Sequence, residues 1–281
     1  VNFFKNEDKI AGFSLYSYEH TEIRREKFYP LNDGNGVYFM QWPSSWGQVW
    51  TEQQWKGFRK WYNNNNLPLD KFDIPPSVKS WPESSWKKFF VAYLVHKERY
   101  FVYPRWSLTS NSGDHGTHSR SGTTPITNVA LLYGTPKIWG LIEINKSIVK
   151  YDSFFQPKVD MLNKLCPWLK EYDYNVDLQA SKPFKTLSKK PYLLSLRECT
   201  QPIKSFDWKL FPFELNIFYG VTGKQLHFGS THCFNNKIPF LKYGPMLTWT
   251  KRLLSPKDYI HIILSKLIKK VYSKFIELIK F

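Results

Sequence analysis

The chain has 281 residues, and 40 Lys plus Arg against 23 Asp plus Glu give it a formal net charge of +17. This length excludes a mini-protein that depends on disulfides or a metal for stability, and it allows one large domain or two small ones. Hydrophobic residues make up 42% and aromatic residues 18% of the chain, which excludes a disordered basic tail. Nucleic acid, anionic lipid headgroups and a phosphate-bearing substrate are the candidate partners for the positive charge.

Cysteine usage and hydropathy narrow the expected compartment. The three cysteines, Cys166, Cys199 and Cys233, form no CxxC pair, which argues against a disulfide framework and a structural zinc site and favours a reducing compartment. The first residues lack a charged region followed by a long apolar one, so we expect no signal peptide. No apolar run reaches the roughly 18 to 20 residues that span a bilayer.

The first third of the chain is predicted to hold two strands and a helix. Residues 9–16 alternate as in a strand, and the turn residues 32–36 precede a second strand, Val37–Met40. Thr51 with Gln54 three residues later is typical of a capping box that begins a helix. Aromatic residues then recur at helical spacing: Trp55, Phe58, Trp61 and Tyr62.

A second helix is predicted after Pro82 and Glu83. Lys87, Lys88 and Lys97 form one face of it. The buried face is predicted from five residues at the spacing of one helix side: Trp86, Phe89, Phe90, Tyr93 and Leu94.

A short strand, Tyr100–Pro104, is predicted next, and a glycine-containing polar loop follows it. From about Leu131 the chain changes to strand-like pieces separated by prolines, and we expect a smaller sheet-containing region that ends near Pro245. The strands predicted there are Ile138–Ile144, Tyr192–Leu196 and Leu215–Tyr219.

The last segment, from Ser255 and Pro256 to Phe281, is predicted as an amphipathic helix. An apolar stripe faces away from a lysine face, so the helix suits the headgroup boundary of an anionic membrane. A terminal helix that docks on the domain with solvated lysines needs only the same stripe, and this alternative stays open. The lysine face holds Lys266, Lys269, Lys270 and Lys274.

The polar loop from Asn111 to His118 gathers groups able to bind a metal–phosphate group or a sugar. His115 and His118 can ligate a metal or donate to phosphate, and Asp114 can accept from a sugar hydroxyl. The plainer interpretation is a hydrogen-bonded turn in which Asp114 and Asn111 cap their own backbone. The pattern alone favours the turn.

Glu83 is expected in the first turn of the second helix, where the helix dipole favours an ionised carboxylate. Trp81 and Trp86 flank it, and a carboxylate beside indole faces is typical of a carbohydrate site, where an acceptor hydroxyl loses its proton to a base. The plainer alternative is a glutamate that only stabilises the helix. Before the first helix, Trp46 is a candidate pocket wall and Gly47 a candidate point of close backbone approach, although tryptophans at this periodicity are more often core.

Five motifs, taken in order and spacing, resemble the C-terminal half of bacterial family 2 glycosyltransferases. Two later runs, Pro202–Phe206 and Pro212–Ile217, resemble the accessory region that follows the catalytic core in some of these enzymes. The resemblance covers most of the chain up to about residue 230. The five motifs are Ala11–Ser14, Ser45–Trp50, Ser80–Trp86, Tyr103–Leu108 and Asn111–His118.

This resemblance implies a GT-A fold and transfer of a sugar from a nucleotide-sugar donor to an acceptor, with a divalent metal, Mg or Mn, held mainly by a DxD motif. The chain contains no DxD, so the family's nucleotide-binding half would precede Val1. The resemblance makes Glu83 the candidate general base and places His118 where a histidine contacts metal or diphosphate, with His115 the second choice. It gives Trp46, Gly47 and Asp114 to the acceptor and donor pocket.

The predicted fold class is therefore α/β. Residues 1–130 are expected to form the acceptor-side half of a GT-A catalytic domain, 131–250 a small accessory region with β-structure, and 251–281 the basic amphipathic helix. Glu83 is the predicted catalytic residue, and His118 is the predicted metal contact. The predicted substrate-binding residues are Trp46, Gly47, Trp81, Asn111, Asp114 and His115.

The predicted function is sugar transfer to a cell-envelope glycan or lipid-linked glycan, in the cytoplasm and at the inner face of the plasma membrane. Two rivals stay open. One is a non-catalytic carbohydrate-binding module whose tryptophans form the platform. The other is a nucleic-acid-binding protein suggested by the positive charge with interleaved aromatic residues, which ranks lower because no binding motif is present, so no nucleic-acid partner is expected.

Overall fold

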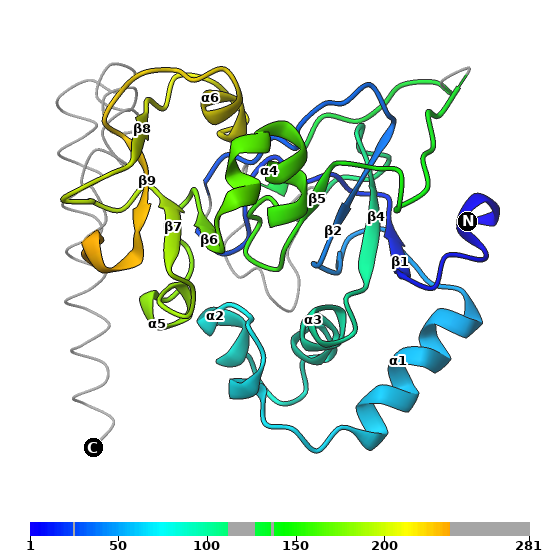
Figure 1. Cartoon of the computed structure of the whole chain (residues 1–281). Coiled ribbons are helices and arrows are strands. Elements are labelled where there is room, and N and C mark those ends of the chain that lie inside the picture. Colours follow the sequence, from blue (N-terminus) through cyan, green and yellow to red (C-terminus); the bar gives the residue numbers. More distant parts are fainter. Residues whose placement is uncertain (25, 112–126, 136–137, 237–281) are drawn as a thin grey trace, which may run out of the picture. The chain divides into compact units, whose positions relative to one another are not determined.

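A computed structural model describes residues 1–24, 26–111, 127–135 and 138–236, and within them two mixed sheets organise the chain (Figure 1). The first sheet has five strands in the order β3-β1-β4-β2-β5. Its strands are β1 Ile10–Ser14, β2 Val37–Met40, β3 Gln48–Val49, β4 Tyr100–Pro104 and β5 Lys150–Tyr151. The predictions of strands at 9–16, 37–40 and 100–104 are confirmed.

The central strands of this sheet run in both directions. β1 and β4 are parallel, with Phe13 opposite Val102, whereas β2 runs antiparallel to β4, with Tyr38 opposite Tyr103. The carboxyl ends of β1 and β4 therefore meet at one edge of the sheet.

Helices cover one face of this sheet. They are α1 Glu52–Asn64 and α3 Trp86–His96, which Figure 1 shows beside the strands. The capping box at the start of α1 is confirmed, because Thr51 accepts from the Gln54 backbone while the Gln54 side chain accepts from Thr51. Aromatic side chains fill the layer between helices and sheet: Phe58, Trp61, Phe90, Tyr93, Phe101 and Tyr103.

The opposite face of the sheet carries a second layer of apolar side chains, because successive residues of a strand point to opposite faces. Here the short helix η1, Asn2–Phe4, contributes Phe4. The sheet residues on this face include Val37, Phe39, Tyr100 and Val102.

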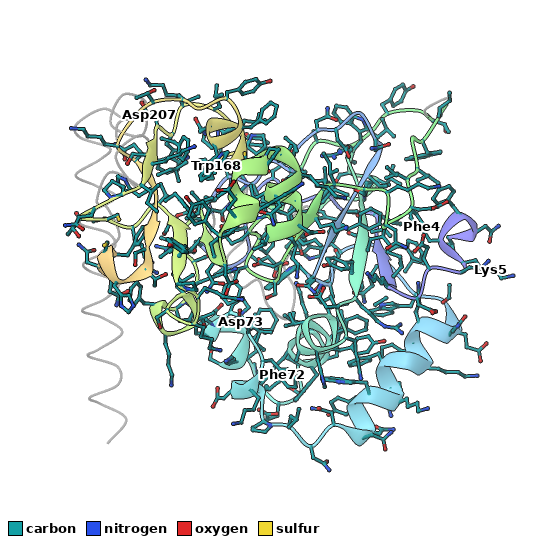
Figure 2. The ribbon with its side chains drawn as sticks, viewed as in Figure 1. Phe4, Lys5, Phe72, Asp73, Trp168 and Asp207 are labelled. Carbon is teal, nitrogen blue, oxygen red and sulfur yellow. The ribbon has the colours of Figure 1, made fainter. Side chains whose placement is uncertain are left out.

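The second sheet has four strands in the order β6-β7-β9-β8, and β6 is parallel to β7 while the other pairs are antiparallel. Its strands are β6 Tyr174–Asp177, β7 Tyr192–Ser195, β8 Lys204–Phe206 and β9 Leu226–Ser230. The predicted strand at 192–196 is confirmed as β7. The remaining short elements are η2 Leu69–Lys71, α2 Pro76–Lys79, α4 Val159–Leu165, η4 Pro167–Glu171, α5 Phe184–Leu187, α6 Glu214–Phe218 and η5 Thr231–Cys233. Figure 2 labels Trp168, on η4, which packs against the core of this sheet.

Two strand predictions are wrong. Residues 215–219 lie in and just after helix α6, which begins at Glu214 after Pro212. A short apolar run does not distinguish a strand from a buried helix turn. Residues 138–144 hold no strand, because Gly140 adopts a positive φ of 56° and its carbonyl accepts from the Gly36 N–H, an irregular path that leaves Ile138 exposed.

Residues 1–236 form one compact unit. The first sheet takes strands from both sides of the predicted boundary at 130/131, since β5 pairs with β2. The predicted amphipathic helix of residues 251–281 lies outside the described residues.

Candidate functional site

The loop before α1 reaches the edge where β1 and β4 end. Ser44 shapes this loop, because its Oγ accepts from the Trp46 N–H at 3.2 Å and donates to the Trp46 carbonyl at 2.8 Å. The Leu15 N–H, directly after β1, donates to the Gly47 carbonyl at 2.7 Å. Trp46 and Gly47 are thereby fixed beside the carboxyl end of β1.

Gly47 is a point of close approach, as predicted, but the approaching group belongs to the chain itself. Its φ is +62°, and a Cβ added there would lie 2.6 Å from Thr109 Oγ1 and 2.9 Å from Leu15 Cβ. A residue other than glycine would meet both a strained backbone and a clash. Gly47 therefore lets the loop pack against the segment after β4.

The segment after β4 closes on the same edge. The Ser17 N–H donates to Ser107 Oγ at 2.5 Å, and the Leu108 N–H donates to the Leu15 carbonyl at 2.7 Å. Asn111 follows at the end of this segment and is half-buried. The structure thus brings Trp46, Gly47 and Asn111 to one edge.

The residues on both sides of 112–126 are attached at this edge. Ser110 Oγ contacts Asn128 Oδ1 at 3.0 Å and accepts from the Val129 N–H at 3.1 Å, while the Tyr16 hydroxyl donates to the Thr127 carbonyl at 3.1 Å. Asp114, His115 and His118 lie outside the described residues.

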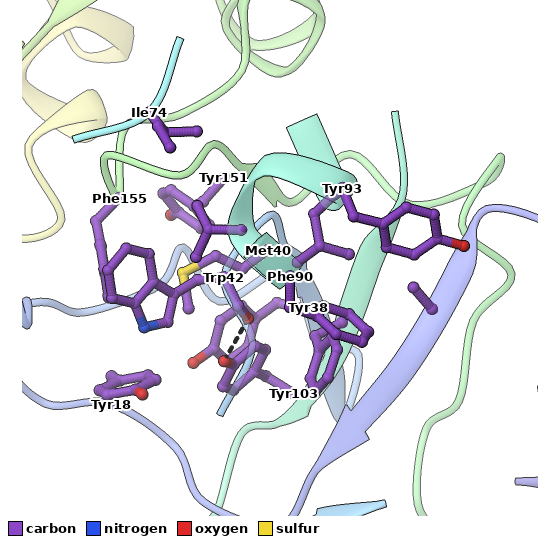
Figure 3. Close-up of a cluster of buried hydrophobic side chains, with 14 of the residues drawn as sticks. Tyr18, Tyr38, Met40, Trp42, Ile74, Phe90, Tyr93, Tyr103, Tyr151 and Phe155 are labelled. Carbon is purple, nitrogen blue, oxygen red and sulfur yellow. Dashed lines mark hydrogen bonds between the residues drawn. The ribbon is translucent and has the colours of Figure 1, made fainter. Parts of the chain in front are cut away.

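Aromatic rings line the region next to Trp46. The half-buried Trp46 packs edge-on against Tyr16, with ring centroids 4.8 Å apart, and lies 6.1 Å from the Tyr18 ring. Tyr18 in turn belongs to a cluster of buried side chains that includes Trp42 and Phe155 (Figure 3). The Tyr103 hydroxyl donates to the Trp42 carbonyl at 2.7 Å and fixes the strand end beneath this cluster.

A buried ion pair adjoins these rings. Lys87 Nζ donates to the two carboxylate oxygens of Glu22 at 2.7 and 2.8 Å, and the Tyr18 hydroxyl donates to the same carboxylate. The side chains of Lys87 and Glu22 are only 8% and 15% exposed. The ammonium lies 5.0 Å from the Trp42 ring centroid and 5.7 Å from that of Trp81, within cation–π range.

The electrostatics of this pair keep Glu22 ionised. Burial by itself raises the pKa of Glu22, but the charge and hydrogen bonds of Lys87, with the hydrogen bond from Tyr18, outweigh it, so the pKa lies below its usual value. Burial, followed by the neighbouring Glu22 charge, raises the pKa of Tyr18 well above its usual value. Tyr18 is therefore a neutral hydrogen-bond donor to a carboxylate.

The sequence pattern did not indicate the Lys87–Glu22 pair, because Lys87 and Lys88 were predicted on the exposed face of a one-sided helix. Both are buried, and α3 is buried on most sides. The unbroken apolar run 89–95 is the signal that could have shown it, since a helix that is apolar all round lies in the core. Lysines beside such a run need buried partners.

The prediction that Glu83 begins the second helix is wrong, because α3 begins at Trp86 with Ser85 as its N-cap. Glu83 lies in the preceding turn with its side chain 79% exposed and pairs with Lys88, whose side chain is 3% exposed. Lys88 Nζ also donates to the Trp81 carbonyl at 2.9 Å. The carboxylate is thus held by a buried cation and open to solvent, a placement due to Lys88 rather than to a helix dipole.

Trp81 connects this turn to the buried pair. Its ring lies edge-on to Trp42, with centroids 6.1 Å apart. Contacts therefore run without a break from Trp46 through Tyr18, Glu22 and Lys87 to Trp81. Half-exposed indole rings with charged hydrogen-bonding groups beside them are suited to bind the faces and hydroxyls of a sugar.

Within residues 1–236, leaving aside the undescribed positions, no group of three or more His, Cys, Asp or Glu side chains is placed to hold a metal ion. The expected metal contact therefore rests on His118 and on the resemblance. In the same described part, no helix combines the length and apolar character needed to cross a membrane. No protein-family model, curated protein or solved structure matches this chain.

Proposed function

We propose that this chain is the acceptor-side part of a family 2 glycosyltransferase, which transfers a sugar from a nucleotide-sugar donor to a cell-envelope glycan. One observation carries the proposal. The motifs Ser45–Trp50 and Tyr103–Leu108, far apart in the sequence, meet where the parallel strands β1 and β4 end. Ligands of open α/β sheets bind at the carboxyl ends of such strands.

In this proposal Trp46 and Trp81 lie against the sugar rings of the acceptor, and Glu83 acts as general base. The acceptor hydroxyl gives its proton to the Glu83 carboxylate while its oxygen forms a bond to the anomeric carbon of the donor. The bond from that carbon to the nucleoside diphosphate breaks, and the diphosphate leaves with its electron pair. The exposure of Glu83 supports the role, because an acceptor hydroxyl can reach it.

The remaining roles come from the resemblance. Asn111, Asp114 and His115 would shape the donor and acceptor pocket. His118 would contact a Mg²⁺ or Mn²⁺ ion, or the diphosphate, together with groups of the nucleotide-binding half that the resemblance implies. A bound divalent cation would supply charge stabilisation to the leaving diphosphate.

We also propose that the protein acts in the cytoplasm, at the inner face of the plasma membrane. The support is the lysine face predicted from the sequence of residues 251–281 and the net charge of +17. Flotation of the full chain with vesicles that contain anionic lipid, but not with neutral vesicles, is the expected result.

The base is tested in a polypeptide that joins this chain to a nucleotide-binding half. We expect Glu83→Gln to lower turnover by about a hundredfold or more, because a positioned base contributes at least that much, with an unchanged fold by circular dichroism. Glu52→Gln is the matched control, since Glu52 is also 79% exposed and pairs with a lysine, Lys56. Wild-type turnover in the Glu83 variant would remove this residue from the role.

Acceptor binding is tested on the chain itself by titrating tryptophan fluorescence with oligosaccharides. Trp46→Ala should weaken binding about tenfold, the loss expected from one ring contact of about 1.4 kcal/mol. Trp55, which lies on α1 outside these motifs and is 37% exposed, supplies the control Trp55→Ala. An equal loss in both variants would contradict a site at Trp46.

The same titrations separate the rival functions. Glycan binding without any transfer once a nucleotide-binding half is present favours a carbohydrate-binding module with the same tryptophans as its platform. Binding to generic oligonucleotides that weakens steeply with salt favours a nucleic-acid-binding protein.

A further inference from the structure

A cavity of about 480 Å³ opens between the facing edges of the two sheets. Its walls include Lys150 and Asp152 on and after β5, the edge strand of the first sheet, and Asn175 on β6, the edge strand of the second. This volume lies in the range of small-molecule sites. Neither Trp46 nor Glu83 lines it, so it is separate from the candidate site above.

The charges in the walls of this cavity balance. Four lysines and four acidic side chains line it, including Asp73, which Figure 2 labels. Six of the eight form three ion pairs, so neither an anion nor a cation meets an excess of opposite charge. The pairs are Lys182–Asp152 at 2.6 Å, Lys158–Glu98 at 2.9 Å and Lys150–Asp160 at 3.1 Å.

Further hydrogen bonds hold these groups in place. Asp152 Oδ1 accepts from the backbone N–H groups of Phe154 and Gln156 at 2.8 and 2.9 Å, which leaves Oδ2 to Lys182. The Tyr100 hydroxyl donates to Glu98 at 3.2 Å. Burial lowers the pKa of Lys182, but the Asp152 charge outweighs it and the net shift is upward, so this lysine stays charged.

Fixed ion pairs select the chemistry of the ligand. Each ammonium has three N–H donors, and each carboxylate has about four acceptor positions, so a pair that is already formed keeps spare donors and acceptors. A hydroxyl group both donates and accepts, and it can therefore bridge a lysine and its acidic partner without breaking the pair. The charged ends of an amino acid would instead compete with each pair for its own partner.

We infer that this cavity binds a small uncharged polyhydroxy compound, such as a mono- or disaccharide, by bridging its hydroxyls across the three ion pairs. The inference rests on the cavity alone and does not need sugar transfer at the other site.

The test titrates the full chain with neutral mono- and disaccharides, with glycine as a zwitterion and with inorganic phosphate, and follows affinity by calorimetry and contacts by ¹H–¹⁵N NMR. Saccharides are expected to bind and to shift the resonances of Asn175 and Val159. Val159→Trp should weaken binding at least tenfold, because Val159 is exposed, lies at the start of α4 and lines the cavity.

Lys164→Trp is the matched control, since Lys164 lies on the same helix, is exposed and does not line the cavity. Asp160→Ala removes one member of an ion pair at an exposed position and should also weaken binding at least tenfold. It provides the test if Val159→Trp does not fold. Tighter binding of glycine or phosphate, no saccharide binding, or an equal loss in Val159→Trp and Lys164→Trp would each overturn the inference.

Discussion

Glu22 and Glu214 are both largely buried carboxyl groups that accept a hydrogen bond from a tyrosine, yet their pKa values shift in opposite directions. Lys87 contacts both oxygens of Glu22, and the pKa of Glu22 lies below its usual value even though burial opposes this. Glu214 accepts from the Tyr151 hydroxyl at 2.6 Å, and burial raises its pKa to about 7. No ion pair to Glu214 is formed in the part of the chain that the structure describes.

The comparison shows that a buried cation, rather than the tyrosine, decides whether a carboxyl group stays charged here. At Glu214 a hydroxyl donor favours the ionised form but does not offset desolvation, whereas at Glu22 the Lys87 ammonium at 2.7 Å, together with the Tyr18 hydrogen bond, does. Charge is thus retained beside the aromatic rings of the candidate site. At Glu214 the fold holds a group that is neutral in acid and half ionised near neutral pH.

Removing the cation should have the largest effect. Lys87→Met keeps most of the side-chain volume but leaves the Glu22 charge buried without its partner. We expect a loss of about 3 to 5 kcal/mol in the free energy of unfolding at pH 7, measured by urea denaturation. Lys56→Met is the control, because the Lys56–Glu52 pair is exposed and should contribute less than about 1 kcal/mol. Equal losses would mean that Glu22 is stabilised by other groups.

Neutralising Glu214 should stabilise the protein at alkaline pH. The folded state raises the pKa of Glu214 from 4.5 to about 7. The stability that this carboxyl contributes is therefore fully present below pH 4.5 and is lost as the pH rises through about 7. Glu214→Gln keeps an acceptor for Tyr151, so at pH 8 it should gain up to about 3 kcal/mol, at about 1.4 kcal/mol for each pKa unit. At pH 4.5 it should gain nothing.

Glu22 should show the opposite pH trend. Its pKa is lowered in the folded state, so its contribution is present above its ordinary pKa and is lost as the pH falls through the folded value. The free energy of unfolding of Glu214→Gln should therefore still fall at acid pH, as in the wild type, but should not fall as the pH rises through about 7. A Glu214→Gln curve parallel to that of the wild type between pH 5 and 8 would sink this explanation.

The elements that the sequence predicted correctly are those with local signals. The Thr51–Gln54 capping box and the aromatic spacing placed α1, and turn residues before Val37 placed β2. Residues 215–219 were mistaken for a strand because the apolar run outweighed Pro212 and Glu214, which are typical of a helix start.

The site was predicted only in part, because its charges come from distant segments. Trp46, Gly47 and Asn111 were named from local motifs, and the structure brings them to one edge. Lys87 and Glu22 are 65 positions apart, and nothing local to either residue indicates the other. Glu83 was expected in the first turn of the helix, but it lies in the turn before α3, where its contact with Lys88 was not foreseen.

The smallest expected effect belongs to Tyr18, whose hydroxyl donates to Glu22 as that of Tyr151 donates to Glu214. Tyr18→Phe removes the hydroxyl that donates to Glu22 and should cost about 2 kcal/mol, because hydrogen bonds to charged groups contribute about 1.5 to 3 kcal/mol. In a Glu22→Gln background the acceptor is neutral, and the same change should cost about 1 kcal/mol. Tyr133→Phe, at a fully exposed tyrosine, should change nothing. An equal cost in both backgrounds would show that Tyr18 acts through packing, and the comparison of the two glutamates would then rest on Lys87 alone.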